Sequence, residues 1–355
     1  MQTDAYSPID RLVHKMAFGM PIARGLLHDL ETSLYKAQLA QVQVRNPVFI
    51  TALPRAGTTL LLELLARHGD AVTHSYRDMP FILSPLIWRK LSTRFHVPIA
   101  KSERAHDDGM TIDADSPEAF EEVVWLHLAP QNFTPRGIEI STDIPDEVAR
   151  GLRDHMARLI ASRAGATGTP NRYVAKNNAD IARLGALRRH FPDAFFVVPV
   201  RHPLDHAQSL LRQHLRFGEI HGEDAFARRY MGDVGHFEFG ALHRPILFPG
   251  FVEETAQLQP DSLEYWLCYW ICAYRHLMQR EDIIWVDMQR FTRDAEIAPL
   301  LRQLDLAEDA TVIEAARHTV RPITGYEETA PVAPESLRTA LSIHAALCDK
   351  AAASG

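Results

Sequence analysis

Residues 47–60 read PVFITALPRAGTTL and pass from a short β-branched run into a loop with one arginine, one glycine and two threonines. The apolar run 47–53 predicts a strand, and leucines spaced three and four residues apart after Thr58 predict a helix. Such a loop lies at the carboxyl end of a strand, where open α/β sheets bind ligands. Gly57 permits close backbone approach, and successive N–H groups at the positive end of a helix attract anions. This stretch therefore predicts an α/β fold with an anion-binding loop.

The strand-then-helix pattern recurs along the chain. Three further short apolar runs, each followed by a helical pattern, are 173–176, 194–200 and 283–286. Nearly continuous apolar strands that alternate with helices indicate a parallel sheet buried on both faces. We therefore expect an α/β fold with a P-loop-type parallel sheet covered by helices on both faces, and a helical insert over the active site.

The segments outside this pattern suggest how one domain over residues 1–355 is organised. We expect an N-terminal helical extension at 1–45, a helical insert at 79–166 that lines the acceptor pocket, and a C-terminal helical region at 296–355. Three prolines within 240–260 predict a long surface connection, the best place for a mobile loop.

Composition limits the partners and the compartment. The 355 residues carry a formal net charge of −7, which argues against a nucleic-acid partner. Three cysteines are too few for a disulfide framework and fit a reducing compartment. No apolar run is long enough for a transmembrane segment. We expect a cytoplasmic protein, with a homodimer as the commonest oligomer of such chains.

The loop differs from that of nucleotide kinases and other NTPases. In their GxxxxGK[ST] motif, a lysine directly follows the second glycine, and the first glycine stands five residues before the second. Here Thr58 stands at the lysine position and Ala52 at the first glycine position, while Arg55 precedes Gly57. The guanidinium fork of Arg55 suits phosphate or sulfonate oxygens.

A second anion site is predicted where the third strand ends. Arg201 follows that strand, and Ser209 lies eight residues later, about two turns into the next helix. Both can face one phosphate, separate from the one at Arg55. Two such sites at the ends of parallel strands suit a ligand with two phosphates.

These motifs resemble those of sulfotransferases that use 3′-phosphoadenosine 5′-phosphosulfate (PAPS). Residues 54–59 resemble the 5′-phosphosulfate loop, and 201–209 resemble the 3′-phosphate motif with its Arg-x₃-Asp-x₃-Ser spacing. Residues 174–177 (VAKN) resemble the strand whose lysine contacts the sulfuryl group in the tyrosylprotein and bacterial branches. The resemblance covers roughly positions 46–295.

Two later features belong to the same resemblance. Residues 284–288 resemble the "YEDL" strand, with tryptophan in place of tyrosine, and Tyr274 stands where that branch has a cofactor-contacting tyrosine. The resemblance implies PAPS as the cosubstrate. The cofactor-binding residues that it implies are Arg55, Ala56, Gly57, Thr58, Thr59, Arg201, Ser209 and Tyr274.

Sulfuryl transfer depends on positioning and charge stabilisation. We expect Arg55 and Lys176 to be catalytic cations, which makes a metal unnecessary. The general base stays open between Asp78 and His106, with Glu118 and Glu121 as further candidates.

The sequence thus predicts in-line sulfuryl transfer from PAPS to a hydroxyl of a small molecule, lipid or glycan. Two alternatives stay open: a P-loop-like nucleotide kinase or NTPase, which magnesium dependence would reveal, and an inactive nucleotide-binding homologue, which would not turn over.

Overall fold

The computed structural model describes residues 21–92, 102–103, 111–112, 116–164, 171–325 and 331–354. At its centre lies a five-stranded sheet in the order β2-β5-β1-β6-β7, with every neighbouring pair parallel. The strands are β1 (Val48–Ile50), β2 (Ala71–Val72), β5 (Arg172–Lys176), β6 (Phe195–Val200) and β7 (Ile283–Asp287).

The four strands expected from the apolar runs are all present. Each run coincides with one strand of the sheet to within a few residues: β1, β5, β6 or β7. The fifth strand, β2, has two residues at the edge beside β5. Two residues are too short a run to give a periodic pattern, so the sequence could not reveal this strand.

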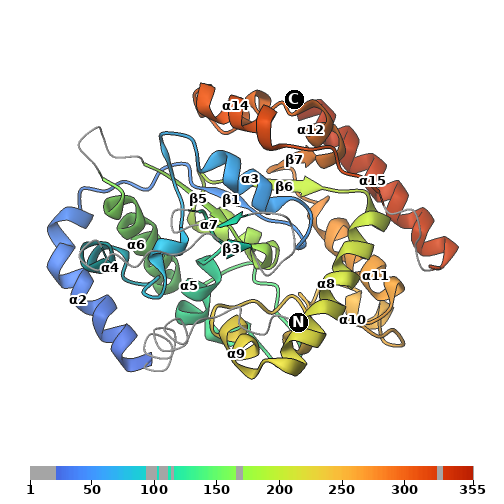
Figure 1. The fold of residues 1–355 in the computed structure, drawn as a ribbon, viewed down its shortest axis with the longest axis horizontal. Coiled ribbons are helices and arrows are strands. Elements are labelled where there is room, and N and C mark those ends of the chain that lie inside the picture. The colour runs from blue at the N-terminus through green and yellow to red at the C-terminus, as the bar shows by residue number, and fades with distance from the viewer. Residues whose placement is uncertain are drawn as a thin grey trace.

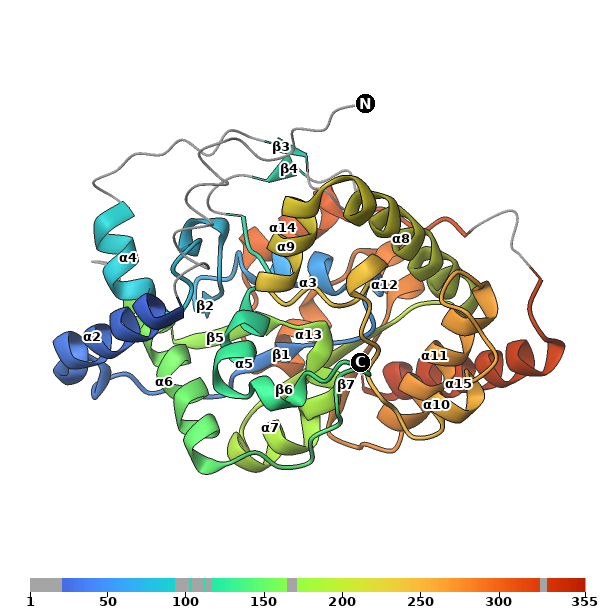
Figure 2. The same cartoon turned by 90° about the horizontal axis from the view of Figure 1, so that it is seen from below.

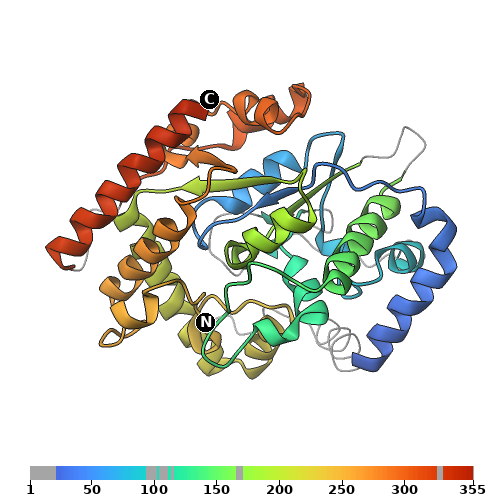
Figure 3. The ribbon, with the colours of Figure 1, turned by 180° about the vertical axis from the view of Figure 1, so that it is seen from behind.

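The side chains of β1 alternate between two apolar layers, as the two-residue period of a strand requires. Val48 and Ile50 belong to the core on one face of the sheet, and Phe49 belongs to the core on the other. Figures 1 and 3 show the sheet from opposite sides, with helices over each face. The predicted parallel sheet with helices on both faces is therefore confirmed.

Different helices supply the two layers. The face toward Val48 is covered by α3 (Thr58–Leu65), α12 (Met288–Asp294), α13 (Ala298–Gln303) and α14 (Ala310–Thr319). The other face is covered by α5 (Glu121–Leu128), α6 (Asp146–Ser162), α7 (Leu184–His190), α8 (Pro203–Glu223), α11 (Leu263–Leu277) and α15 (Pro334–Ser354).

The remaining elements lie around this centre. They are α2 (Pro21–Leu39), α4 (Pro85–Ser92), α9 (Ala225–Asp233), α10 (Phe251–Glu254) and the strand pair β3 (Ser102–Glu103) and β4 (Thr111–Ile112). Figure 2 shows α2 and α4 on one side of α3, and α8 on the other. None of the helices in these described ranges has the length and apolar content to cross a membrane.

The connection 240–260 contributes to the core instead of only crossing the surface. Ile246, Phe248 and Phe251 are buried in it. The backbone of Leu247 donates to the carbonyl of Ile138, and Ile138 donates in turn to Pro245. The consecutive apolar residues 246–248, between Pro245 and Pro249, allow this segment to pack while it turns.

Candidate functional site

The loop after β1 has the backbone geometry of an anion site. Arg55 and Gly57 both have positive φ angles, 71° and 105°, and α3 begins at Thr58. Left-handed residues within a tight turn gather successive N–H groups into a concave nest that attracts anions. A non-glycine residue with positive φ is uncommon, and such strain is concentrated at functional sites.

The first predicted anion motif and Arg201 of the second line one cleft at the carboxyl ends of the strands, whereas Ser209 is buried and does not line it. The cleft holds about 1160 Å³ of empty space, counted out to its open mouth. Its lining includes 54–60, Lys176 at the end of β5, Arg201 after β6, and Met288 at the start of α12.

The two motifs touch one another. Arg55 Nε donates to Ser209 Oγ at 3.2 Å, and Arg201 Nη1 donates to the carbonyl oxygen of Arg55 at 3.3 Å. Arg201 and Ser209 of the second motif thus both form hydrogen bonds with Arg55 of the first motif. The two anion sites expected from the sequence adjoin at Arg55, and both arginines face a common cleft.

A buried histidine supports the loop from behind. His206 Nε2–H donates to the carbonyl oxygen of Pro54 at 2.7 Å, and its side chain is fully buried. Burial, reinforced by the nearby charges of Arg201 and Arg55, lowers the pKa of His206 to about 3. A neutral His206 therefore fixes the turn without adding charge. No motif in the sequence marks His206 as a support for this turn.

A further cation comes from the C-terminal part of the chain. Arg321 and Ile323 line the cleft beside Thr292, whose Oγ1 accepts from the backbone N of Ile323 at 3.3 Å. No motif surrounds Arg321 in the sequence, so only the fold could reveal it.

The opposite end of the cleft is apolar. The rings of Phe217 and Phe239 stack with their centroids 6.1 Å apart, and Met231 lies on the same wall. His221 is buried here, and neither ring nitrogen has a hydrogen-bond partner within the described part of the chain. This wall comes from α8, α9 and the segment after them. Of the described insert residues, only Glu118 lines this cleft, whereas the insert was expected to line the acceptor pocket.

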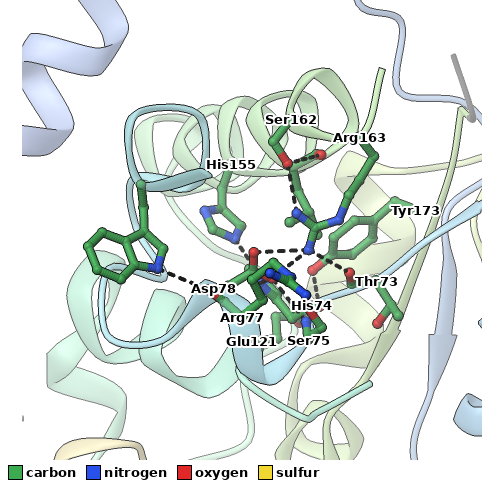
Figure 4. Close-up of polar contacts among 12 residues, drawn as sticks. Thr73, His74, Ser75, Arg77, Asp78, Glu121, His155, Ser162, Arg163 and Tyr173 are labelled. Carbon is green, nitrogen blue, oxygen red and sulfur yellow. Dashed lines mark hydrogen bonds and ion pairs between the residues drawn. The ribbon is translucent and has the colours of Figure 1, made fainter. Parts of the chain in front are cut away.

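Asp78 lies apart from the cleft, in a buried ion network (Figure 4). Its Oδ2 accepts from Arg163 Nη2 at 2.7 Å and from the backbone N of Ser75 at 2.9 Å, and it lies 3.1 Å from His74 Nδ1. Burial alone would raise the pKa of Asp78, but the hydrogen bond from His74 and the charge of Arg163 hold it well below its usual range. The structure does not bring this carboxylate to the cations of the cleft.

Three other expected site residues have different positions. Tyr274 is fully buried, and its hydroxyl donates to the carbonyl of Pro199 at 3.1 Å, so it supports β6 and does not line the cleft. Glu121 accepts from the Tyr173 hydroxyl at 2.8 Å inside the core. His106 lies outside the described residues.

Two residues that the sequence analysis missed line the cleft beside Lys176. They are His236 and Glu238, in the irregular segment between α9 and the short 3₁₀ turn at Gly240–Leu242. No spacing motif marks them in the sequence, because their neighbours in the site are distant in the chain.

Solved structures resemble this fold. Sulfotransferase STF9 from Mycobacterium avium aligns with a TM-score of 0.53 and 15% identity, over 98% of this chain and 87% of its own. Sulfotransferase STF1 from Mycobacterium tuberculosis H37Rv aligns with a TM-score of 0.46 and 15% identity, over 90% and 82%. No curated protein matches the sequence.

The sequence also matches a family model, described as "Sulfotransferase family", over residues 47–234. This match covers more than half of the 355 residues and begins just before the strand that leads into the anion loop. It also includes Lys176, Arg201 and Ser209. The chain therefore belongs to the sulfotransferase family.

Proposed function

We propose that this protein transfers the sulfuryl group of PAPS to a hydroxyl group of a small molecule, lipid or glycan. One observation carries the proposal: Arg55, Lys176 and Arg201 line a single cleft together with the amides of the loop before α3. A nucleotide with a phosphate at each end of its ribose matches two adjoining cationic sites.

The residues of the cleft suit the charge that develops in this reaction. Negative charge grows on the oxygen that bridges sulfur and the 5′-phosphate as their bond breaks. We assign Arg55, Lys176 and the backbone N–H groups of 57–59 to that oxygen and its phosphate. Preorganised donors of this kind are each worth about 10² to 10³ in rate.

The apolar end supports an acceptor whose hydroxyl group adjoins an apolar portion. Phe217, Phe239 and Met231 offer a surface for such a portion. Burying it would contribute about 25 cal/mol per Å² of apolar area removed from water. A small apolar alcohol, a phenol or a lipid fits this wall better than an unsubstituted sugar.

The donor assignment is tested by ligand-dependent thermal unfolding. Adenosine 3′,5′-bisphosphate should raise the unfolding temperature more than ATP with magnesium at equal concentration. A ligand at 100 times its Kd adds about 2.7 kcal/mol to stability. Arg201→Ala should remove most of this difference, whereas Arg150→Ala, on the exposed face of α6, should keep it. A larger shift with ATP and magnesium would favour a nucleotide kinase or NTPase.

The catalytic assignment is tested by the rate of sulfuryl transfer. Lys176→Ala should lower kcat about 10² to 10³-fold. Lys36→Ala, exposed on α2, is the matched control and should keep the wild-type rate. Normal bisphosphate binding without any turnover in the wild-type protein would indicate an inactive homologue.

A further inference from the structure

A continuous chain of polar contacts leads from the anion loop to a histidine in the cleft wall. Thr58 Oγ1 donates to Asn178 Oδ1 at 3.4 Å, and Asn178 Nδ2 donates to Glu238 Oε1 at 3.1 Å. The other carboxylate oxygen, Glu238 Oε2, lies 3.5 Å from His236 Nδ1. All these residues line the same cleft as Arg55 and Lys176.

Glu238 is held in its ionised form. Burial alone would raise its pKa, but the hydrogen bond and charge of His236, the charge of Lys176 and the hydrogen bond from Asn178 together lower the pKa of Glu238 to about 2. A carboxylate with so low a pKa is a poor proton acceptor near neutral pH. It is well suited to holding a proton on His236 Nδ1 and to stabilising the imidazolium ion that forms when Nε2 takes a proton.

The other carboxylates that the sequence offered as bases are occupied. Glu118 reaches the cleft, but its Oε2 accepts from the Tyr76 hydroxyl and its Oε1 from the backbone N of Ala119. Asp78 is held by Arg163 in the buried ion network described above. An imidazole also has the unperturbed pKa nearest to neutrality among the side chains of this cleft.

Building on the proposed function, we propose that His236 is the general base of sulfuryl transfer and that Glu238 is the residue that positions it. The proton of the acceptor hydroxyl passes to His236 Nε2 as the acceptor oxygen forms its bond to sulfur. The bond from sulfur to the bridging oxygen breaks, and its electron pair stays on the 5′-phosphate. Arg55 and Lys176 stabilise the negative charge that develops there. After product release, His236 returns the proton to water.

Two acceptors that need no knowledge of the natural substrate provide the test. Release of adenosine 3′,5′-bisphosphate from PAPS is measured from pH 5 to pH 9 with water alone and with 2-phenylethanol, an alcohol whose hydroxyl group does not ionise in this range. His236→Ala should lower kcat about 10² to 10⁴-fold, as loss of a general base does. The Kd of adenosine 3′,5′-bisphosphate should stay within about twofold, which also shows that the variant is folded. His318→Ala, exposed on α14, should match the wild type.

The pH profile separates positioning from a merely structural role. The other charged and titratable groups that line the cleft with His236 are Arg55, Glu118, Lys176, Arg201, His221, Glu238 and Arg321. Glu238→Gln keeps the shape but removes the negative charge that favours imidazolium. The acid limb of kcat should therefore move to lower pH in Glu238→Gln and disappear in His236→Ala. Added imidazole should restore part of the rate of His236→Ala.

Each failure has its own meaning. A wild-type rate and an unchanged acid limb in His236→Ala would overturn the assignment of the base and leave the proposed function standing. A wild-type protein that binds no adenosine 3′,5′-bisphosphate, or releases none from PAPS with either acceptor, would overturn the proposed function and this assignment with it. An unchanged acid limb in Glu238→Gln would overturn the role of Glu238.

Discussion

Arg55 and Ser209 are joined by a hydrogen bond of 3.2 Å, although 154 positions separate them in the chain. The serine fixes the Nε end of the guanidinium group, so the remaining nitrogens of Arg55 have a defined direction. One side chain thereby links the loop before α3 to helix α8. The orientation of the arginine in the first motif therefore depends on a serine of the second motif.

Ser209→Ala should loosen Arg55 without removing its charge. One hydrogen bond contributes about 0.5–1.5 kcal/mol, so the Kd of adenosine 3′,5′-bisphosphate should rise by up to about tenfold. Isothermal titration calorimetry measures the change. Ser336→Ala, at the start of α15 and outside the cleft lining, serves as the control. An equal Kd in Ser209→Ala and wild type would show that the hydrogen bond does not orient the arginine.

Gly57→Ala should damage the loop in two ways. The φ angle of 105° disfavours a side chain, and an added Cβ would lie 2.5 Å from Met288 Cε. The left-handed conformation alone costs about 1–2 kcal/mol, so the free energy of unfolding should fall by at least that amount. Removing the contact with Met288→Ala should recover only part of the loss.

A matched glycine provides the comparison for this variant. Gly218 lies on the exposed face of α8, and no atom lies within 4 Å of the place that an added Cβ would take. Gly218→Ala should stabilise the protein by about 0.5–1 kcal/mol, since alanine favours a helix. Urea unfolding compares the two. Equal stability of Gly57→Ala and wild type would contradict the steric argument.

Asp78→Asn should lower the free energy of unfolding strongly and should change the kcat of sulfuryl transfer little. Removing one partner of a buried ion pair costs roughly 3–5 kcal/mol. The pKa of Asp78 is lowered in the folded state, so its stabilisation is complete above the unfolded value of 3.8 and is lost as the pH falls below it. Urea unfolding between pH 7 and pH 3 should therefore show a steeper acid loss for wild type than for Asp78→Asn.

A control separates this effect from surface charge. Asp146 lies at the start of α6, and its side chain is 84% exposed. The control variant Asp146→Asn should therefore change the free energy of unfolding little. If Asp78→Asn is folded and its kcat still drops 10²-fold or more, Asp78 has a role in the reaction that its position does not explain.

His221→Phe should stabilise the protein. The ring is buried with no hydrogen-bond partner for either nitrogen within the described residues, and an unsatisfied buried polar group costs about 1–3 kcal/mol. Burial, together with the charge of Arg228, lowers the pKa of His221. The unfolded state therefore binds an extra proton below about pH 6.5, so the wild type loses stability as the medium is acidified.

The gain from His221→Phe should accordingly be larger at pH 5 than at pH 7.5, as urea unfolding at both values measures. The Kd of adenosine 3′,5′-bisphosphate should not change, because His221 lies at the apolar end of the cleft. A loss of stability at both pH values would mean that the imidazole nitrogens are satisfied in solution.

The meeting of the two arginine motifs could be predicted because it follows from local patterns and parallel topology. A strand, a glycine turn and a helix are encoded within 47–65, and a second strand leads to Arg201. Strands β1 and β6 are parallel neighbours, so the residues after them meet at one edge of the sheet. The meeting of Arg55 and Arg201 thus needed no information from distant packing.

The rest of the site depends on contacts that no local pattern encodes. Asp78 looked like an available carboxylate, but Arg163 and His74 bind it, and the arginine lies 85 positions away. His236 and Glu238 lie in an irregular segment whose place in the cleft is fixed by α8, α9 and the residues that follow. Their site partners Lys176 and Asn178 come from the end of β5 and the turn after it.

Helix α8 runs beside both ends of the cleft. Ser209 lies in its first half, against Arg55, and Phe217 and His221 lie in its last turns. At 1.5 Å per residue, about 12 Å of rigid helix separates Ser209 from Phe217. The same helix therefore fixes the spacing between the proposed nucleotide site and the proposed acceptor wall, so substitutions in its final turns can change that wall without altering the contact between Ser209 and Arg55.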